Sequence, residues 1–447
     1  MLTDDIYQPG NDGGLVYESA PDQALTRVRG AKVRQIVACN DDEASRHVSR
    51  RIEPRWRWPG DPPVFRVASS LVIMRDTEYR NNGVRVGGKW LLSGAAGDRF
   101  WSRVLAPLSN DEIAAESRAL ADSRGDSPIR VRGGSSAVSD KVPFAVDLRN
   151  GFNFYHFLTE GLPQLAVIAQ VESSAPIHVH MPRLADLKGF IGRFIDTLFP
   201  QLTPRIAFTD ERTTYDRVRA VYQHRHYLYQ VNDPQVGAAL AELAEDDPWR
   251  DLSLKAQSRG FVAKSTIDDG QVLLAEAARA RLAQAGGTDW PEQVLVMRDP
   301  NAGARDRPDE KDKRFVGDMT DLGFKVLYME RMSPLEQMSL WASARMIVSP
   351  HGAAFAQMFF ADPANEVIEI GTPQTQAHRW GDFLQNAHVS RCRYTTIFTE
   401  CSRVGLSGEA ARRIAPPMAD GHLGLRFNRK VVDAIASRVA SMDQAAA

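Results

Sequence analysis

The sequence predicts an α/β fold in which parallel sheets are covered by helices on both faces. Between residues 293 and 370, short runs rich in Val, Ile and Leu alternate with segments of helical periodicity. Strands that alternate with helices at this spacing pair in parallel. The chain has 447 residues, enough for two or three domains. Its composition, 43% hydrophobic and 25% charged, is typical of a soluble globular protein.

Four parts can be distinguished along the chain. The first is rich in Arg, Asp, Gly and Pro, so we expect an extension that wraps the surface, followed by short strands. Because Arg and Trp interleave in 50–58, a basic patch that faces an acceptor or a membrane is the alternative interpretation. Gly286 and Gly287 end a helical run and mark a domain boundary. The parts are an N-terminal extension (1–60), an N-terminal α/β domain (61–286), a C-terminal parallel-sheet domain (287–400) and a C-terminal tail (401–447).

The N-terminal domain begins with short strands and continues as alternating strand and helix. Residues 64–104 contain alternating or apolar runs around a turn signal at Asn81-Asn82-Gly83. Beyond them, strands are predicted at 144–148 and 177–181, and in the segments RIAF and RVRAVYQHRHYLY. Helices are predicted at 152–170, 187–199, 234–246 and 271–285.

The C-terminal domain has the clearest signals in the sequence. A capping box opens its second helix, with Ser333 as N-cap, Pro334 as the first helical residue and Glu336 reaching back. Gly323 stands where a helix end favours left-handed backbone. Strands are predicted at 293–298, 324–330, 346–350 and 366–370, and helices at 312–323, 333–344 and 351–360.

Charge and composition exclude several classes of function. Lys and Arg total 55 and Asp and Glu total 56, a net charge of −1, which gives no bulk-charge argument for binding nucleic acid. No apolar run approaches the roughly 18 residues of a membrane-spanning helix. The first residues lack the basic start and apolar core of a signal peptide. Three cysteines without C-x-x-C spacing provide neither a disulfide framework nor a zinc site. We therefore expect a soluble, cytoplasmic protein.

Common cofactor motifs are missing or incomplete. No G-x-G-x-x-G follows a strand, and no D-x-D pair is present to hold a divalent metal against a diphosphate. Gly83–Lys89 has the glycine and lysine spacing of a phosphate loop, but Trp90 replaces the required Ser or Thr, so we interpret it as a hairpin. His178 and His180 share one face of a strand without further metal ligands at a clear spacing. We expect no metal and no bound cofactor.

A candidate phosphate-binding site lies in the segment IVSPHGAAFAQ. Ser349–Ala354 follow a parallel strand and open a helix, and α/β sheets bind ligands at that edge. A helix N-terminus presents unpaired N–H groups and partial positive charge. Gly352 and Ala353 are small enough for a diphosphate to approach the backbone, and His351 can donate a hydrogen bond to it. The alternative is that small residues only allow close helix–sheet packing.

Three further residues are candidates for binding the same ligand. Glu369, in the strand 366–370, can grip ribose hydroxyls, or it is a salt-bridged edge residue. Arg298 ends the strand 293–298, and Arg305 lies in the loop that follows. Arginines that reach phosphates would stabilise a departing nucleotide without a metal. Solvated loop arginines are the alternative.

A second candidate site lies in the helix predicted at 152–170. Asn153, His156, Glu160 and Gln164 fall on one stripe of this otherwise apolar, aromatic helix. A histidine with a carboxylate one turn away is a workable general base, because the carboxylate orients the ring and supports its charged form. A solvated stripe is the alternative.

Together these residues resemble glycosyltransferase family 61, whose bacterial members are often described as capsular polysaccharide biosynthesis proteins. The likeness covers about 140–400. Where this chain has Glu160, family members typically carry Asp, and no Asn-Glu pair follows the second arginine, which is Arg305 or Arg307. The segments that carry the likeness are Asn153-x-x-His156-x-x-x-Glu160-Gly-Leu-Pro-Gln-Leu, Arg298 with an arginine downstream, and Ser-Pro-His351-Gly-Ala-Ala with Glu-Val-Ile-Glu369-Ile.

The resemblance implies a GT-B-like architecture, with two Rossmann-like domains facing a cleft. It also implies inverting, metal-independent transfer of a sugar from a nucleotide sugar to a glycan or lipid-linked glycan, in the cytoplasm or at the inner face of a membrane. The final helix, about 431–442, would pack back on the N-terminal domain. A catalytically inactive nucleotide-sugar or glycan-binding protein is the alternative. The implied catalytic residues are His156, Glu160 and Asn153, and the implied donor-binding residues are Arg298, Arg305, His351, Gly352, Ala353 and Glu369.

Overall fold

The computed structural model describes most of the chain but not all of it. The helix predicted at 234–246 and the candidate Arg305 lie outside the described residues. The described ranges are 4–40, 64–80, 83–94, 140–148, 153–225, 265–286, 289–299, 310–371, 381–399 and 427–446, with short stretches of one to three residues between 42 and 49 and between 97 and 138.

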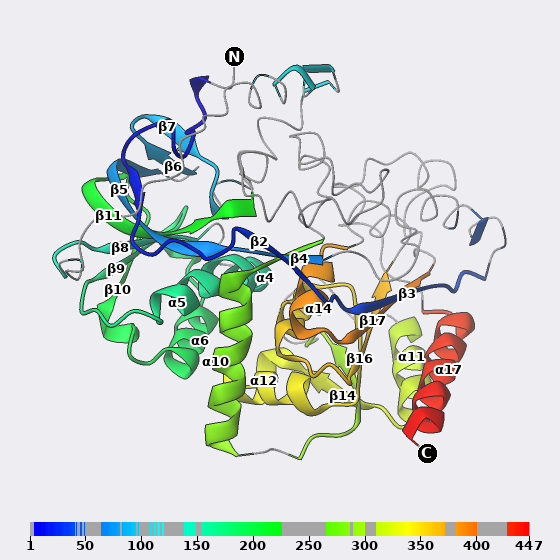
Figure 1. Cartoon of the computed structure of the whole chain (residues 1–447). Helices are drawn as coiled ribbons and strands as arrows, with labels where there is room; N and C mark the ends of the chain where they lie inside the picture. The colour runs from blue at the N-terminus through cyan, green and yellow to red at the C-terminus, as the bar shows by residue number, and fades with distance from the viewer. Residues whose placement is uncertain are drawn as a thin grey trace. The chain divides into compact units, whose positions relative to one another are not determined.

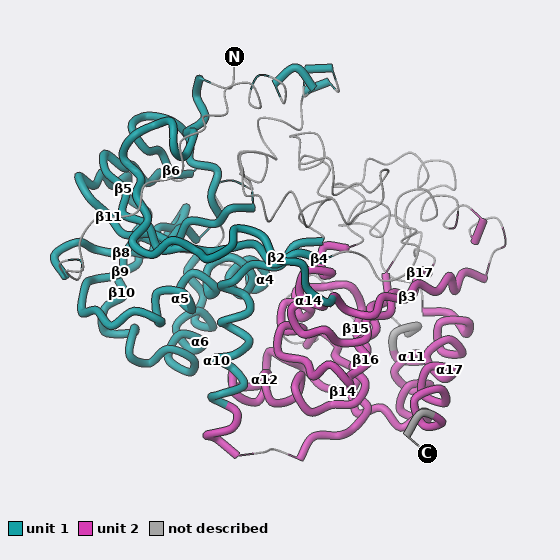
Figure 2. Tube along the Cα trace, viewed as in Figure 1, with its two compact units in different colours: residues 1–29, 63–281 teal, residues 30–62, 282–447 magenta. Residues whose placement is uncertain are grey.

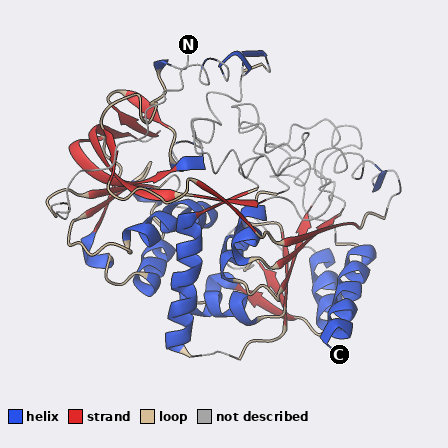
Figure 3. Ribbon diagram, viewed as in Figure 1, coloured by secondary structure: helices blue, strands red, loops and turns tan. Residues whose placement is uncertain are grey.

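The chain divides into two compact units, shown in separate colours in Figure 2. Unit 1 comprises 1–29 and 63–281, and unit 2 comprises 30–62 and 282–447. The division falls between Arg281 and Leu282, within helix α10 (Asp269–Ala285), a few residues before the Gly286 at which the sequence predicted a boundary. Each unit combines sheets with helices (Figure 3), so the fold is mixed α/β with parallel strands.

Unit 1 is built on an eight-stranded mixed sheet in the order β10-β9-β8-β11-β5-β6-β7, with β1 paired to β5. Strands β10, β9, β8 and β11 run parallel, whereas β5, β6 and β7 are antiparallel to their neighbours. The bounds are β1 Leu15–Tyr17, β5 Ser69–Arg80, β6 Gly83–Val86, β7 Lys89–Leu91, β8 Phe144–Asp147, β9 Ile177–His180, β10 Ile206–Thr209 and β11 Thr213–Gln223.

The parallel part of this sheet has a topological switch point at β8. Strand β8 lies between β9, which follows it in the chain, and β11, which comes later. Open α/β sheets bind ligands beyond the carboxyl ends of strands at such a point. The segment that follows β8 is α4 (Phe154–His156), a π-helical turn η3 (Phe157–Gly161) and α5 (Leu162–Ile168). The sequence predicted one regular helix here. Helix α6 (Gly189–Leu198) then connects β9 to β10.

A second, three-stranded sheet of unit 1 has the order β12-β4-β2. Strand β12 (Thr266–Asp268) pairs in parallel with β4 (Val64–Val67), and β2 (Leu25–Val28) pairs with β4 in the antiparallel sense. Helix α10 begins directly after β12. The start of α10 is therefore fixed to the strands that lead into β5.

Unit 2 is built on a six-stranded, fully parallel sheet in the order β14-β13-β15-β16-β17-β3. Its switch point lies between β13 and β15, because β14 pairs on one side of β13 and all later strands follow on the other. The apolar runs predicted in the sequence form β13 to β16. The bounds are β13 Gln293–Met297, β14 Lys325–Tyr328, β15 Met346–Pro350, β16 Glu366–Gly371, β17 Arg393–Phe398 and β3 Lys32–Val37.

Helices cover both faces of this sheet (Figure 1). On one face, α11 (Glu310–Asp321) and α17 (Arg429–Ala446) pack against alternate residues of the strands, among them Val348, Ile368 and Ile397. On the other are α12 (Pro334–Ser343), the 3₁₀ helix η9 (Ala353–Phe360) and α14 (Leu384–Ser390), which contact one another. The predicted capping box of Ser333 and Glu336 is present, and Gly323 has φ of 89°.

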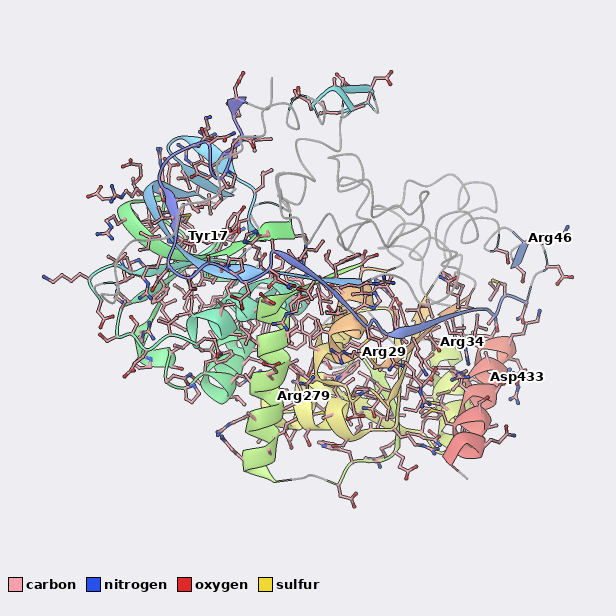
Figure 4. All side chains as sticks on the ribbon, viewed as in Figure 1. Tyr17, Arg29, Arg34, Arg46, Arg279 and Asp433 are labelled. Carbon is pink, nitrogen blue, oxygen red and sulfur yellow. The ribbon has the colours of Figure 1, made fainter. Side chains whose placement is uncertain are left out.

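The C-terminal helix corrects one expectation from the resemblance. Helix α17 packs within unit 2 rather than on the N-terminal domain, because its apolar residues join the core beneath α11. Buried Glu366 accepts two hydrogen bonds from Arg438 of this helix, at 2.9 and 3.2 Å. Asn428, just before the helix, donates to the carbonyl of Ala38 at 2.8 Å. Figure 4 labels Asp433 on α17 and Arg34 on β3, both in unit 2.

The described part of residues 1–60 contributes short strands to sheets of both units. Strand β1 joins the large sheet of unit 1, β2 joins the small sheet, and β3 forms the edge of the sheet in unit 2. Strand β3, KVRQIV, has no strict alternation of apolar and polar residues, and it pairs with β17 some 360 positions later in the chain. Short strands of this kind carry a weak local signal, so only their distant partners identify them.

Candidate functional sites

In unit 1, the candidate base lies beyond the carboxyl end of β8. Asn153 caps α4, and its side chain accepts a hydrogen bond from the backbone N–H of His156 at 3.3 Å. The Nδ1 atom of His156 lies 2.7 Å from Oε1 of Glu160. The two side chains are 24% and 14% exposed, so both reach solvent from a largely buried segment. Asn153, His156 and Glu160 are thus brought together as the sequence predicted.

The fourth residue of the predicted stripe points elsewhere. Gln164 is buried, and its amide donates to the carbonyls of Asp147 and Glu160, each at 3.0 Å. The cause is the π-helical turn, in which the N–H of Leu162 bonds the carbonyl of Phe157, five residues back. The extra residue in this turn rotates everything after it relative to His156. Such turns are frequent at functional sites.

In unit 2, two candidate residues follow adjacent strands at the switch point. The pairing of β13 with β15 ends at Leu295 and Val348, and Arg298 and His351 each come three residues after the last paired residue of their strand. Arg298 is exposed. The next residue, Asp299, is held by Arg331 through two hydrogen bonds of 2.7 and 2.8 Å, which fixes the start of this loop.

The loop after β15 presents free backbone donors. Gly352 has extended backbone, and the segment from Ala353 is a 3₁₀ helix rather than the α-helix that the sequence suggests. The first backbone hydrogen bond of this helix runs from Phe355 N–H to Gly352 C=O at 3.3 Å. Among the described residues, no acceptor engages the N–H groups of Gly352, Ala353 and Ala354. Three adjacent free N–H groups suit an anion.

Glu369 has partners that differ from the ribose hydroxyls suggested by the sequence. The carboxylate is buried, with one oxygen bonded to Nδ1 of His351 and the other accepting from the hydroxyl of Tyr394. Both oxygens are therefore engaged inside unit 2, and the carboxylate orients the ring of His351. Phe383 lies against the same ring, with centroids 4.9 Å apart. Sequence reasoning missed Tyr394, since nothing in the strand RYTTIF marks it.

The two histidines share one arrangement. In each, a carboxylate holds Nδ1, and within the described part of the chain no hydrogen bond occupies Nε2. A carboxylate on Nδ1 fixes the tautomer, so Nε2 accepts a proton when the ring is neutral and donates one when the ring is charged. His156 thereby suits a general base, and His351 suits a donor to an anion.

The other polar candidates have structural roles. The hydroxyl of Tyr215 contacts both His178 and His180, each at 2.8 Å. Burial lowers the pKa of His178 and lowers that of His180 to about 4, so both rings are neutral at pH 7. In the described ranges, no group of three or more potential metal-binding side chains gathers. Gly83–Lys89 forms the predicted hairpin of β6 and β7, with φ of 55° at Gly87 and 85° at Gly88.

Comparison with known proteins agrees with the resemblance seen in the sequence. The model of the family described as Glycosyltransferase 61 matches residues 154–368, just under half of the chain. The matched segment runs from the first residue of α4 to the middle of β16, so it includes His156, Glu160, Arg298 and His351. No curated protein matches the chain. A helix long and apolar enough to span a bilayer is not found among the described residues.

Proposed function

We propose, taking residues 154–368 as a glycosyltransferase family 61 region, that the chain transfers a sugar from a nucleotide sugar to a glycan with inversion at the anomeric carbon. Unit 2 binds the donor and unit 1 supplies the base, the division of roles in a GT-B enzyme. The family match supports glycosyl transfer, and the two histidine–carboxylate pairs support these roles. The observation that carries the proposal is that the histidine of each pair follows a strand at the switch point of its sheet.

The donor half of the proposal rests on the loop after β15. The diphosphate of the donor accepts hydrogen bonds from the N–H groups of Gly352 and Ala353 and from Nε2 of His351. Arg298 neutralises charge on the same group, with Arg305 as a second candidate. Glu369 orients the ring through Nδ1, so a charged His351 would present its Nε2–H to the leaving nucleotide without a metal. Stabilising the departing charge in this way supplies much of the rate.

The acceptor half rests on His156. Its Nε2 takes the proton from an acceptor hydroxyl as the oxygen forms a bond to the anomeric carbon. The bond from that carbon to the phosphate oxygen breaks on the opposite face, and its electron pair leaves with the nucleoside diphosphate. The charge that develops on His156 is balanced by Glu160, 2.7 Å from Nδ1. A positioned base of this kind contributes about 10²–10⁴-fold.

Capsular or other extracellular polysaccharide synthesis is the pathway that we propose for this activity. Nucleotide sugars are the usual donors for such polymers, and the acceptor is a growing or lipid-linked glycan. The proposal places the enzyme in the cytoplasm, at the inner face of the membrane where the acceptor is lipid-linked.

Release of nucleoside diphosphate from a panel of nucleotide sugars, with EDTA present and with oligosaccharide acceptors, tests the proposal. We expect His156→Ala to lower kcat by about 10²–10⁴-fold while donor binding is unchanged. His351→Ala should weaken binding of the nucleoside diphosphate as well as turnover. The matched control is His178→Asn, a partly buried strand histidine outside both sites, which should keep wild-type kcat. Nucleotide binding without any turnover in the wild type would favour an inactive binding protein instead.

A further inference from the structure

The π-helical turn that carries Glu160 contains a backbone carbonyl that a regular α-helix could not satisfy. Pro163 has no N–H, and in a regular helix that N–H would bond the carbonyl of Thr159, four residues back. The proline ring also clashes with that carbonyl, which explains why the chain widens into a π-helical turn here. Thr159 is buried. Because a buried carbonyl without a donor is costly, a group other than residue 163 must donate to it.

Gln271 of α10 supplies that partner. Its Nε2 donates to the carbonyl of Thr159 at 3.2 Å, and its Oε1 accepts from the backbone N–H of Asp268 at 3.1 Å. The side chain is 2% exposed, so water does not replace it. Both ends of the amide are engaged, which allows a single orientation between the start of α10 and the π-helical turn.

The start of α10 is itself fixed to the strands of unit 1. The carboxylate of Asp268 accepts from the N–H of Gly270 at 2.8 Å and from the hydroxyl of Ser69 at 2.7 Å. The carboxylate of Asp269 accepts from the N–H of Ser69 at 3.1 Å and is paired with Arg66. These bonds join α10 to the junction of β4 and β5. Gln271 therefore extends from a segment of backbone that these bonds hold in place.

The backbones of α10 and α5 also approach closely at this point. A Cβ atom added to Gly270 would lie 2.6 Å from the carbonyl oxygen of Pro163. Only glycine fits there without displacing the helix. The contact places Gln271 within reach of Thr159.

We infer that Gln271 is a positioning residue for the His156–Glu160 pair, an inference that rests on the proposed function. By occupying the Thr159 carbonyl, Gln271 holds the turn in its π-helical form. That form sets the direction in which Glu160 and His156 face relative to α5, because a regular helix would differ by one residue of rotation. Gln271 touches no substrate and acts through the turn.

The first test is Gln271→Met, which keeps the length of the side chain and removes its donor. We expect kcat to fall by about 10²-fold with the donor KM unchanged, because a base displaced by about 1 Å loses that much. Thermal unfolding should shift down by about 2–4 °C. The control is Asn365→Ala, which removes another buried amide bonded to the carbonyls of Trp341 and Ala342. It should lower the melting temperature and leave kcat unchanged.

A double-mutant cycle separates positioning from general destabilisation. If Gln271 acts through His156, then Gln271→Met should change kcat less than about 2-fold in a His156→Ala background. An equal loss of kcat in both backgrounds overturns the inference. Gly270→Ala provides a second route, since its methyl group pushes α10 from Pro163, and it should reproduce the loss of kcat.

Pro163→Ala in the Gln271→Met background tests the cause directly. The restored N–H can bond the Thr159 carbonyl, so the melting temperature should recover while kcat stays low. Recovery of both, or of neither, contradicts the inference. Amide hydrogen exchange over 154–162 gives a readout without turnover: Gln271→Met should accelerate it there and not in unit 2. If exchange is faster in Gln271→Met but the wild-type chain transfers no sugar from any donor, the positioning role of Gln271 holds and the proposed function is wrong.

Discussion

The described histidines occur in two kinds of environment, which differ in whether a carboxylate contacts the ring. His156 and His351 each have a carboxylate on Nδ1. His180 and His224 are buried without one, and burial lowers the pKa of each to about 4. The difference follows from the cost of desolvating a charged ring when no anion compensates it. Under the proposed function, residues of the same type thus serve proton transfer in one place and neutral packing in the other.

Buried neutral histidines predict an acid-sensitive fold. A histidine in the unfolded chain has a pKa near 6.5, above the value of about 4 for His224 in the folded chain. Between these values the unfolded state binds more protons, so the free energy of unfolding falls as pH drops from about 6.5 to about 4. A fully buried histidine can contribute about 3 kcal/mol to this fall.

His224→Gln should therefore flatten the dependence of the melting temperature on pH over that window. Tyr17→Phe is the matched control, because it removes the hydroxyl 3.1 Å from Nε2 and leaves the ring buried. That variant should keep the acid sensitivity. Equal pH dependence in the wild type and His224→Gln, measured by calorimetry from pH 4 to 7, would contradict this explanation.

Sequence reasoning located the site residues better than their partners. The spacing of Asn153, His156 and Glu160 predicted their grouping, since residues three and four apart on a helix are neighbours. The partners of Glu369 were not predictable, because Tyr394 approaches it from a strand formed 25 residues later. Gln271 reaches Thr159 across 112 residues for the same reason. Such contacts depend on tertiary packing and carry no local signal.

At the scale of elements, regular hydrophobic periodicity predicted the strands and regular helices of unit 2, whereas the irregular helices could not be predicted from it. The strands of unit 2 follow their apolar runs closely, and α12 begins at the predicted capping box. The two exceptions are the π-helical turn η3 and the 3₁₀ helix η9, which both lie at candidate sites. In η3 the reason is Pro163. In η9 the side chain of Asn386 donates to the carbonyl of Phe355 at 3.0 Å, a contact made by α14.

The capping box gives a prediction about the stability of α12. Ser333 accepts from the N–H of Glu336, and the Glu336 carboxylate accepts from the N–H of Ser333 at 2.7 Å. Ser333→Ala should lower the free energy of unfolding by about 1 kcal/mol. Thermal or denaturant unfolding measures it. Ser441→Ala on the exposed side of α17 is the control, and an equal effect of both would show that the cap contributes nothing.

At the scale of the whole molecule, the chain order and the spatial order differ. Strands β1, β2 and β3 come from one N-terminal segment and join three sheets in two units. Helix α17 returns from the far end of the chain to complete the core of unit 2. Sequence reasoning predicted a parallel sheet in the C-terminal half. It predicted the final helix but not that its apolar residues join the core of unit 2, and it missed strand β3, whose partner β17 comes some 360 residues later.

Because the two units have separate cores, we expect the chain to unfold in more than one step. A ligand stabilises the folded state of the unit that binds it, so it raises the temperature at which that unit unfolds. The proposed function assigns the nucleotide to unit 2. A ligand at 100 times its Kd contributes about 2.7 kcal/mol, enough to move a melting temperature by about a degree or more.

The most direct measurement is thermal unfolding of the wild type and His351→Ala against UDP, GDP, CDP, CMP and their common sugars, with EDTA throughout. We predict that one nucleotide class raises the melting temperature of the wild type and leaves that of His351→Ala unchanged. A cooperative transition that no nucleotide shifts, or an equal shift in both proteins, would contradict a donor site at His351-Gly352-Ala353.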